Sequence, residues 1–267
     1  MKKQKIYFIT YGDEKFKISK KHLIGLANYS GLFEECISFG PKDLSREFVK
    51  TYKNILNFER GGGYWIWKHY LLEKVLNEID KNDILIYCDA GASFNYKAKK
   101  RFFEYIEILN NSEFGNLRIE CEKIHIEKNW TSNELFNYFE IDKNSNIRSS
   151  TQLQGGHILL KNNSHSDLFI NEFKNTLNFD ENLITDFYNN QNQADYFIEN
   201  RHDQSIFSLI TKKYGGEIIE NETIFEKGSE NQLNFPFLSV RKGGHGLRDR
   251  ILFRFRYPRL RKQPIYF

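Results

Sequence analysis

The sequence predicts one α/β domain in which a mostly parallel central sheet is followed by an α+β C-terminal part. Residues 84–88 are a continuous apolar run, which is typical of a strand buried on both faces of a parallel sheet. Residues 6–10 are a second apolar run rich in β-forming residues, and they lead into a loop that starts at Tyr11. Stretches with apolar residues at helical spacing lie between and after these runs, so strands alternate with helices in the first half of the chain.

The rest of the chain contains fewer strand signals. Helical spacing of apolar residues predicts helices at 42–58, 64–79, 96–110, 166–177 and 205–213. A further strand is predicted at 157–160, directly after two glycines, and 179–200 form a long polar stretch. Because no internal repeat and no linker rich in Ser or Pro divides the chain, we expect one domain over 1–247 and a separate tail at 248–267.

The formal charge of +4 is unevenly distributed along the chain. Residues 248–267 contain seven basic residues and one acidic residue, so they carry +6 and leave −2 on residues 1–247. A protein that binds nucleic acid along its whole length would spread its positive charge, so the body of the chain argues against that class. A binder of single-stranded nucleic acid that uses only the basic, aromatic tail remains as an alternative.

Cysteine use and hydropathy indicate the compartment. The three cysteines are widely spaced and include no C-x-x-C pair, so neither a disulfide framework nor a thiolate zinc site is expected, and a reducing, cytoplasmic location fits best. The apolar run near the N-terminus is too short for the core of a signal peptide. No run approaches the roughly 20 apolar residues of a membrane span. We therefore expect a soluble or peripherally attached protein.

Asp89 is the most informative single residue. It follows the apolar run 84–88, and Gly91 would allow a close approach of the backbone to a ligand. In open α/β sheets, ligands bind outside the carboxyl ends of the strands, where a carboxylate can meet a metal ion or a ribose. The alternative is that Asp89 only caps a turn, since Asp and Gly are ordinary turn residues.

Five short segments that carry polar chemistry occur in a fixed order along the chain. They are Arg60-Gly61-Gly62-Gly63-Tyr64-Trp65-Ile66-Trp67-Lys68, Asp89-Ala90-Gly91, Gln154-Gly155-Gly156-His157, His202-Asp203-Gln204-Ser205 and Gly243-Gly244-His245-Gly246. This series, which spans roughly 6–246, resembles the nucleotide-sugar glycosyltransferases of the GT-A fold, of the kind that build bacterial surface polysaccharides. The resemblance implies a Rossmann-related fold with a donor-binding half at about 1–115 and an acceptor-binding half at about 116–247.

The resemblance also implies a role for each segment. Asp89 is similar in position to the first acid of the Asp-x-Asp motif, which holds a divalent metal and the donor diphosphate. Residues 154–157 resemble the glycine-rich segment that follows this motif. Asp203 and Gln204 resemble the start of the acceptor-side helix in glycogenin-type transferases, and His245 is placed like the late histidine that completes the metal site.

One departure from the family pattern concerns the metal. Gly91 stands where the second acid of Asp-x-Asp is expected. Mn²⁺ or Mg²⁺ prefers oxygen ligands and can keep several waters, so Asp89, His245 and the donor phosphates could still form a site. The alternatives are that metal binding is weak and depends on the substrate, or that basic side chains replace the metal.

The donor side requires cations, because the diphosphate leaving group gains negative charge as the sugar–phosphate bond breaks. Arg60, Lys68, His245 and Arg248 are the candidates. The alternative for Arg60 is a surface ion pair, and the alternative for the three glycines after it is a flexible turn. The other residues expected to bind the donor are Thr10 and Tyr11 at the end of the first strand, Trp65, Asp89, Gly91, Gly155 and Gly156. One of Trp65 and Trp67 is expected to pack in the core while the other stacks on a base or sugar ring.

Asp203 is the candidate carboxylate on the acceptor side. In an inverting transferase it would deprotonate the acceptor hydroxyl, and in a retaining one it would position the acceptor. Its alternative role is that of a helix N-cap. His157 and His202 are expected to contact the acceptor, with the alternative that each is a structural, hydrogen-bonded histidine. Asp89 and Asp203 are therefore the two predicted catalytic residues.

The tail alternates aromatic residues with arginines at 253–257. Such a segment would dock on an anionic membrane surface, unless its aromatic side chains pack onto the domain instead. The function expected from the resemblance is transfer of a hexose from a UDP-sugar to a glycan or a lipid-linked glycan in capsule, O-antigen or lipooligosaccharide synthesis, at the inner face of the cytoplasmic membrane. A catalytically silent glycan-binding relative is the other alternative.

Overall fold

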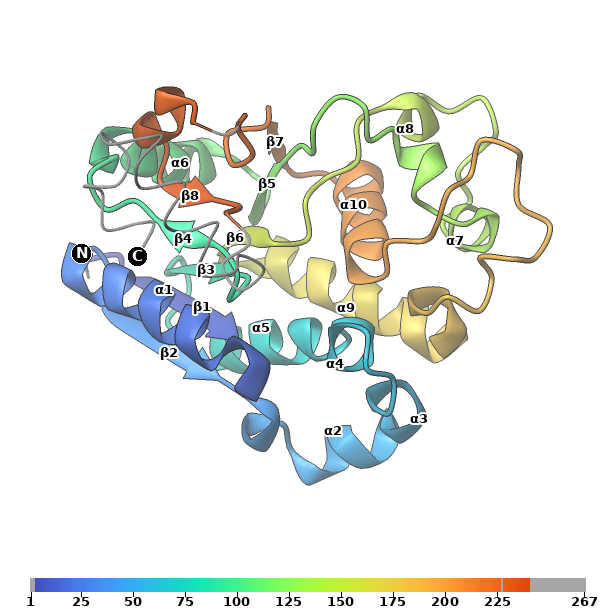
Figure 1. Cartoon of the computed structure of the whole chain (residues 1–267), viewed down its shortest axis with the longest axis horizontal. Coiled ribbons are helices and arrows are strands. Elements are labelled where there is room, and N and C mark those ends of the chain that lie inside the picture. The colour runs from blue at the N-terminus through green and yellow to red at the C-terminus, as the bar shows by residue number, and fades with distance from the viewer. Residues whose placement is uncertain (1–2, 227, 241–267) are drawn as a thin grey trace.

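The computed structural model describes residues 3–226 and 228–240, and these form an α/β fold around a six-stranded sheet (Figure 1). The strand order is β2-β1-β3-β6-β5-β7. The bounds are β1 Ile6–Tyr11, β2 Glu35–Phe39, β3 Ile84–Cys88, β5 Asn116–Ile119, β6 His157–Lys161 and β7 Glu217–Ile219. A separate antiparallel pair is formed by β4 (Ser93–Phe94) and β8 (Phe237–Leu238).

The directions of the strands confirm the predicted fold class. β1 runs parallel to both β2 and β3, and β5 runs parallel to β7. β6 is antiparallel to its two neighbours, β3 and β5. In this register Cys88, the last residue of β3, pairs with His157, the first residue of β6. The two segments that flank these residues, 89–91 and 154–156, therefore meet at one edge of the sheet.

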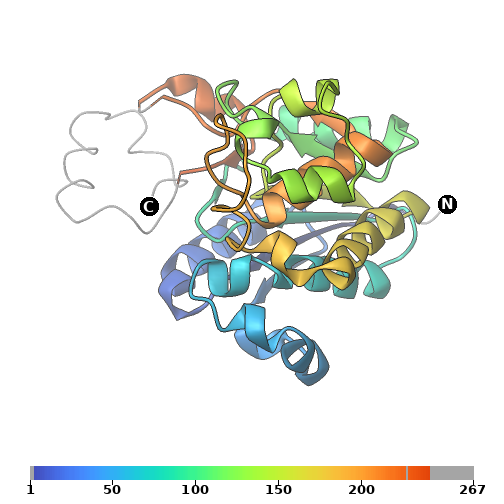
Figure 2. The same ribbon diagram turned by 90° about the vertical axis from the view of Figure 1, so that its right-hand side faces the viewer.

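Helices cover both faces of the sheet (Figure 2). The long helices are α1 (Lys17–Ser30), α5 (Trp67–Glu78), α6 (Lys99–Asn111), α9 (Ser164–Phe179) and α10 (Asp203–Tyr214). The short ones are α2 (Arg46–Thr51), α3 (Lys53–Leu56), α4 (Gly61–Tyr64), α7 (Asn133–Tyr138) and α8 (Asn146–Ser149), with 3₁₀ turns η1 (Glu14–Phe16), η2 (Pro41–Asp43), η3 (Glu127–Asn129), η4 (Glu181–Ile184) and η5 (Glu230–Asn234).

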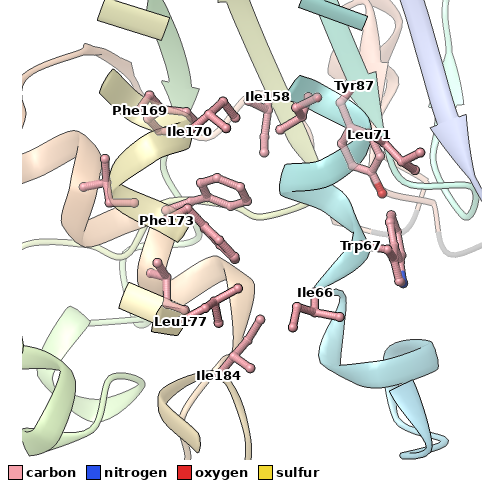
Figure 3. Packing of buried hydrophobic residues seen from close by; sticks show 14 of the residues in the cluster. Ile66, Trp67, Leu71, Tyr87, Ile158, Phe169, Ile170, Phe173, Leu177 and Ile184 are labelled. Carbon is pink, nitrogen blue, oxygen red and sulfur yellow. The ribbon is translucent and has the colours of Figure 1, made fainter. Parts of the chain in front are cut away.

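Each face of the sheet has its own apolar core. α1 and α6 pack on one face, where Phe8, Ile86 and Phe102 are fully buried. α5, α9 and α10 pack on the other, and Figure 3 shows side chains of α5 and α9, among them Leu71 and Phe173, directed into this second core. Because the residues of β3 alternate between these cores, the whole strand is buried and reads as an unbroken apolar run.

Several elements differ from the sequence-based expectation. The expected helix 42–58 is divided into α2 and α3 at Tyr52, and the last predicted helix begins two residues earlier, at Asp203. α1, β2, β5 and β7 were not predicted. No helix in the described part of the chain is long and apolar enough to cross a membrane. The tail 248–267 lies outside the described residues.

Candidate active site

Asp89 lies where β3 and β6 meet. Its backbone N–H donates a hydrogen bond to the carbonyl oxygen of Gly156 at 2.9 Å, so the two segments are joined at this point. The hydroxyl of Tyr87 donates to Asp89 Oδ1 at 2.6 Å, which fixes one oxygen of the carboxylate. The Asp89 side chain remains 43% exposed. This carboxylate is therefore both held in place and open to a ligand.

Asp203, the first residue of α10, lies on the other side of a glycine pair. A Cβ atom on Gly155 would come within 3.3 Å of Asp203 Oδ2, and one on Gly156 would come within 3.0 Å of Asp89 Oδ2. These are closer approaches than a side chain tolerates without movement of its neighbours. A larger residue at either position would therefore press on one of the carboxylates, and the structure places Asp89 and Asp203, the two predicted catalytic residues, on the two sides of this glycine pair.

Lys68, in the first turn of α5, links the two carboxylates. Its Nζ donates to Asp203 Oδ2 at 2.5 Å and to the carbonyl oxygen of Gly155 at 2.8 Å, and it lies 3.6 Å from Asp89 Oδ1. The side chains of Lys68 and Asp203 are only 2% and 5% exposed. Lys68 was expected to contact the donor diphosphate; instead, its buried ammonium is occupied by these protein oxygens and orients the carboxylates.

The protonation of Asp203 reflects two opposing effects. Burial raises the pKa of its carboxyl to about 6, while the neighbouring Lys68 ammonium lowers it. A carboxylate with a pKa near 6 is mostly ionised at pH 7 and is a stronger proton acceptor than an ordinary aspartate. This is the behaviour required of a general base that acts on a hydroxyl group.

Behind the glycine pair, a buried hydrogen-bond network extends into the core. Gln204 Oε1 accepts the backbone N–H of Gly155 at 3.0 Å, and Gln204 Nε2 donates to Gln152 Oε1 at 2.6 Å. Gln152 Nε2 donates in turn to Glu127 Oε1 at 3.0 Å, and Glu127 pairs with Lys212 at 2.6 Å. Apart from Gln204, these residues were not predicted, because each comes from a separate element and none carries a local motif.

Arg118 is a second buried cation near the site. It lies in the middle of β5, where its guanidinium donates to the carbonyl oxygen of Gln154 at 2.5 Å and packs over the rings of Phe169 and Phe207. Burial lowers its pKa to about 10, and the charge of Asp203 opposes this shift. Neighbouring backbone carbonyls, those of Gln154 and Gly155, are therefore each held by a buried cation.

The three glycines before α5 form an unusual left-handed turn. All five residues from Gly61 to Trp65 have positive φ, and the N–H groups of Tyr64 and Trp65 bond to carbonyls four residues earlier. A left-handed conformation is costly for a residue with a Cβ atom, and runs of it are rare. The N–H of Lys68 bonds to the carbonyl oxygen of Trp65 at 3.0 Å, so this turn also sets the start of the helix that carries Lys68.

The aromatic and basic residues of this segment are divided between core and surface. Trp67 is buried and stacks on Tyr11 with ring centroids 3.8 Å apart, so one of the two tryptophans packs in the core as predicted. Trp65 is partly buried and stacks on His202. Arg60 pairs with Asp186 and Glu199 at 3.3 and 3.0 Å, which matches the ion-pair alternative rather than a free cation for phosphate.

Both predicted acceptor histidines are buried and neutral. His157 contacts Gln154 Oε1 through Nδ1 at 3.2 Å, and burial lowers its pKa to about 4. His202 Nδ1 lies 2.8 Å from the carbonyl oxygen of Ile184, and burial lowers its pKa to about 4 as well. His202, not Asp203, occupies the N-cap position of α10, so the N-cap alternative for Asp203 is wrong. Thr10 is fully buried at the end of β1.

The described residues do not by themselves form a divalent-metal site. No group of three His, Cys, Asp or Glu side chains converges anywhere in 3–226 or 228–240. At Asp89, the Tyr87 hydroxyl occupies Oδ1, the Lys68 ammonium lies nearby, and Gly91 supplies no side-chain ligand. The other predicted ligand, His245, lies outside the described residues, as does Arg248.

No protein-family model matches the sequence, and no curated protein matches it either. Several solved structures align with most of this chain. A glycosyltransferase involved in glycosylation of the major capsid of PBCV-1 has a TM-score of 0.49 at 9% identity, covering 95% of this chain and 98% of the other. Mouse xyloside xylosyltransferase 1 has a TM-score of 0.45 at 11% identity, covering 81% and 85% of the two chains. The galactosyltransferase LgtC, solved with donor and acceptor sugar analogues, has a TM-score of 0.44 at 10% identity, covering 81% and 74%.

These solved structures are glycosyltransferases, the class whose GT-A members the sequence motifs resemble. With TM-scores below 0.5 and identities of 9–11%, these similarities carry no argument about the fold or the function of this chain.

Proposed function

We propose that this chain is a glycosyltransferase that moves a sugar from a nucleotide-sugar donor to a hydroxyl group of an acceptor. The observation that carries this proposal is the pair of carboxylates, Asp89 and Asp203, held by one buried lysine across a glycine pair. The pair lies beside the carboxyl end of β3, the edge at which open α/β sheets bind nucleotides.

The arrangement suits sugar transfer because the two carboxylates differ in environment. Glycosyl transfer passes through an oxocarbenium-like state, and a carboxylate near the sugar ring stabilises its positive charge or accepts a proton from the nucleophile. Asp89 is half-exposed and would face the donor, whereas Asp203 is buried with a raised pKa and would act on the acceptor hydroxyl. Lys68 keeps both groups oriented and partly offsets their mutual repulsion.

In its finer form the proposal names a UDP-hexose as donor and a glycan or lipid-linked glycan of a bacterial surface polysaccharide as acceptor. The order of the sequence motifs supports this choice. The +6 charge of residues 248–267 supports a location at the anionic inner face of the cytoplasmic membrane. In this proposal a divalent cation, Mn²⁺ or Mg²⁺, would have Asp89 as one of its ligands. Its other ligands would be groups beyond the described residues.

Thermal unfolding with a panel of nucleotide sugars tests the proposal. UDP-, GDP-, CMP- and dTDP-sugars are added in turn, each with and without Mn²⁺. One nucleotide class at about 100 times its dissociation constant should raise Tm by at least about 5 °C. If Mn²⁺ increases this shift, Asp89→Asn should remove the increase, whereas Asp167→Asn, a surface carboxylate paired with Lys81, should keep it. If no nucleotide class raises the Tm of the wild-type chain, the proposal is wrong.

A further inference from the structure

A cluster of polar and aromatic side chains lies beside Asp203, between the left-handed turn and the segment that leads into α10. We call it the Arg60 cluster; its members are Arg60, Tyr64, Trp65, Asp186, Glu199 and His202. We propose that the Arg60 cluster is the acceptor subsite and that it receives a neutral sugar ring. This inference rests on the proposed glycosyltransferase function and names the acceptor chemistry.

The charged members of the cluster are fixed before any ligand arrives. Arg60 bonds to Asp186 and Glu199, and the hydroxyl of Tyr64 donates to Asp186 Oδ2 at 3.1 Å. The three charged side chains nevertheless remain partly exposed: Arg60 is 42% exposed, Asp186 36% and Glu199 34%. Preorganised donors and acceptors with open edges are what a ring bearing several hydroxyl groups requires.

The backbone is strained where it presents the aromatic members. Tyr64 and Trp65 have φ of 52° and 58°, and His202 has φ of 56°. Left-handed backbone at residues with side chains persists only where the surrounding structure enforces it, and it is concentrated at functional sites. Here it directs Tyr64 to Asp186 and stacks Trp65 on His202, at 24° between the ring planes. The indole of Trp65 is partly buried against His202 and Gly61, and its exposed part is suited to lie against the apolar face of a sugar ring.

His202 supplies an independent indication of a missing hydrogen-bond donor. Its Nδ1 is engaged with the carbonyl oxygen of Ile184, so in the neutral ring Nε2 is an acceptor. This buried Nε2 has no hydrogen-bond partner among the described residues, and it lies 3.7 Å from another acceptor, Asp186 Oδ1. Two hydrogen-bond acceptors, His202 Nε2 and Asp186 Oδ1, thus face each other without a donor between them. A small shift of these side chains would let the hydroxyl group of a bound sugar donate its proton there.

The charge of the cluster selects the kind of sugar. With His202 neutral, one arginine and two carboxylates sum to −1. Such a cluster repels phosphate and carboxylate groups, so it is unsuited to the donor diphosphate and to acidic sugars. The Arg60 cluster is adjacent to the reacting centre at two points of the chain. His202 directly precedes Asp203, and Trp65 lies three residues before Lys68, which binds Asp203.

Saturation-transfer NMR with simple glycosides tests the assignment. The probes are neutral methyl glycosides of glucose, galactose and N-acetylglucosamine, set against glucuronate and glucose 6-phosphate, with a panel of UDP, GDP, CMP and dTDP in parallel samples. We expect at least one neutral glycoside to bind at least tenfold more tightly than either acidic sugar. Trp65→Leu and Arg60→Ala should each weaken that binding at least fivefold while leaving nucleotide binding within twofold.

The matched controls are Phe103→Leu, an exposed aromatic residue on α6, and Arg46→Ala, an exposed arginine on α2; both should bind the glycoside as the wild type does. Glu199→Gln provides a milder variant, and it should narrow the preference for the neutral sugar over the acidic ones. Equal binding of the neutral glycoside by wild type and Trp65→Leu, or no glycoside binding by a chain that binds a nucleotide, overturns the subsite. Glycoside binding that depends on Trp65 in a chain that binds no nucleotide supports the subsite and overturns the transferase function instead.

Discussion

The ammonium of Lys68 lies 2.5 Å from the carboxylate of Asp203 in a part of the molecule where both side chains are almost fully buried. A buried pair of this kind contributes little net stability, because both ions lose their hydration. It becomes costly to break, since the remaining charge then has no partner. The relationship therefore predicts what happens when either residue is removed.

Lys68→Met should lower the free energy of unfolding by about 3–5 kcal/mol, because it leaves Asp203 buried and unpaired. The double variant Lys68→Met with Asp203→Leu should recover most of this loss. Urea denaturation at pH 7.5 measures both. Lys81→Met, which breaks an exposed pair with Asp167, serves as the control and should cost less than about 1 kcal/mol. A Lys68→Met variant as stable as the control would show that the pair is not buried as described.

The turnover rate should depend on pH through Asp203. Its pKa of about 6 means that activity requiring the ionised carboxylate falls as the pH is lowered through about 6. Because the pKa is raised in the folded state, the contribution of this group to stability is present below about pH 4 and is lost as the pH rises through about 6. In Lys68→Arg, which keeps the cation, the acid limb of kcat/KM should stay near 6. An acid limb near pH 4, the range of an ordinary aspartate, would contradict this assignment.

Gly156→Ala should reduce turnover at least tenfold with only a modest effect on folding. The new methyl group would meet Asp89 Oδ2 at 3.0 Å and displace the half-exposed carboxylate. Gly25→Ala on α1 is the matched control, because nothing lies within 4 Å of its added methyl group. That control should gain roughly 0.5–1 kcal/mol of stability and keep full activity. Equal activity of the two variants would show that Gly156 is not part of the active site.

The left-handed turn should tolerate asparagine better than alanine. Gly62 has φ 59° and ψ 52°, and the nearest atom to an added Cβ, Trp67 Nε1, is 3.8 Å away, so a substitution there is opposed by backbone conformation and not by a clash. Gly62→Ala should cost about 1–2 kcal/mol, and Gly62→Asn should cost less because asparagine enters this region more readily. Chemical denaturation measures both. Equal losses of unfolding free energy in Gly62→Ala and Gly62→Asn would show that the left-handed backbone conformation does not set the cost of substitution at this position.

The parts of the fold that were predictable are those in which local pattern and final burial agree. Residues 84–88 are apolar throughout because both faces of β3 are covered. α9 and α10 show a regular apolar stripe because their apolar residues pack into one core. α1 was missed because it buries few apolar residues and contains Gly25. β2 is a partly exposed edge strand, and β5 places the charged Arg118 in the core, so neither shows the apolar pattern expected of a buried strand.

The candidate site was predictable in its residues but not in their contacts. Asp89, Gly155, Gly156 and Asp203 carry short motifs at the ends of recognisable elements, so they could be grouped in advance. The partner of Lys68 could not be identified, because 135 positions separate it from Asp203 and only the packing of α5 against the sheet brings them together. The same applies to Arg60, whose carboxylate partners follow it by more than 120 residues.

Release of nucleoside diphosphate from a panel of nucleotide sugars shows most directly whether Asp89 and Asp203 carry out sugar transfer. The assay compares wild type with Asp89→Asn, Asp203→Asn and the surface control Asp167→Asn, in the presence of a mixture of neutral methyl glycosides and Mn²⁺. We expect wild type and Asp167→Asn to release diphosphate from at least one donor at similar rates, and each of the other two variants to be at least 100-fold slower while still folded. Release by Asp89→Asn and Asp203→Asn at the wild-type rate, or no release by the wild type from any donor, would contradict this expectation.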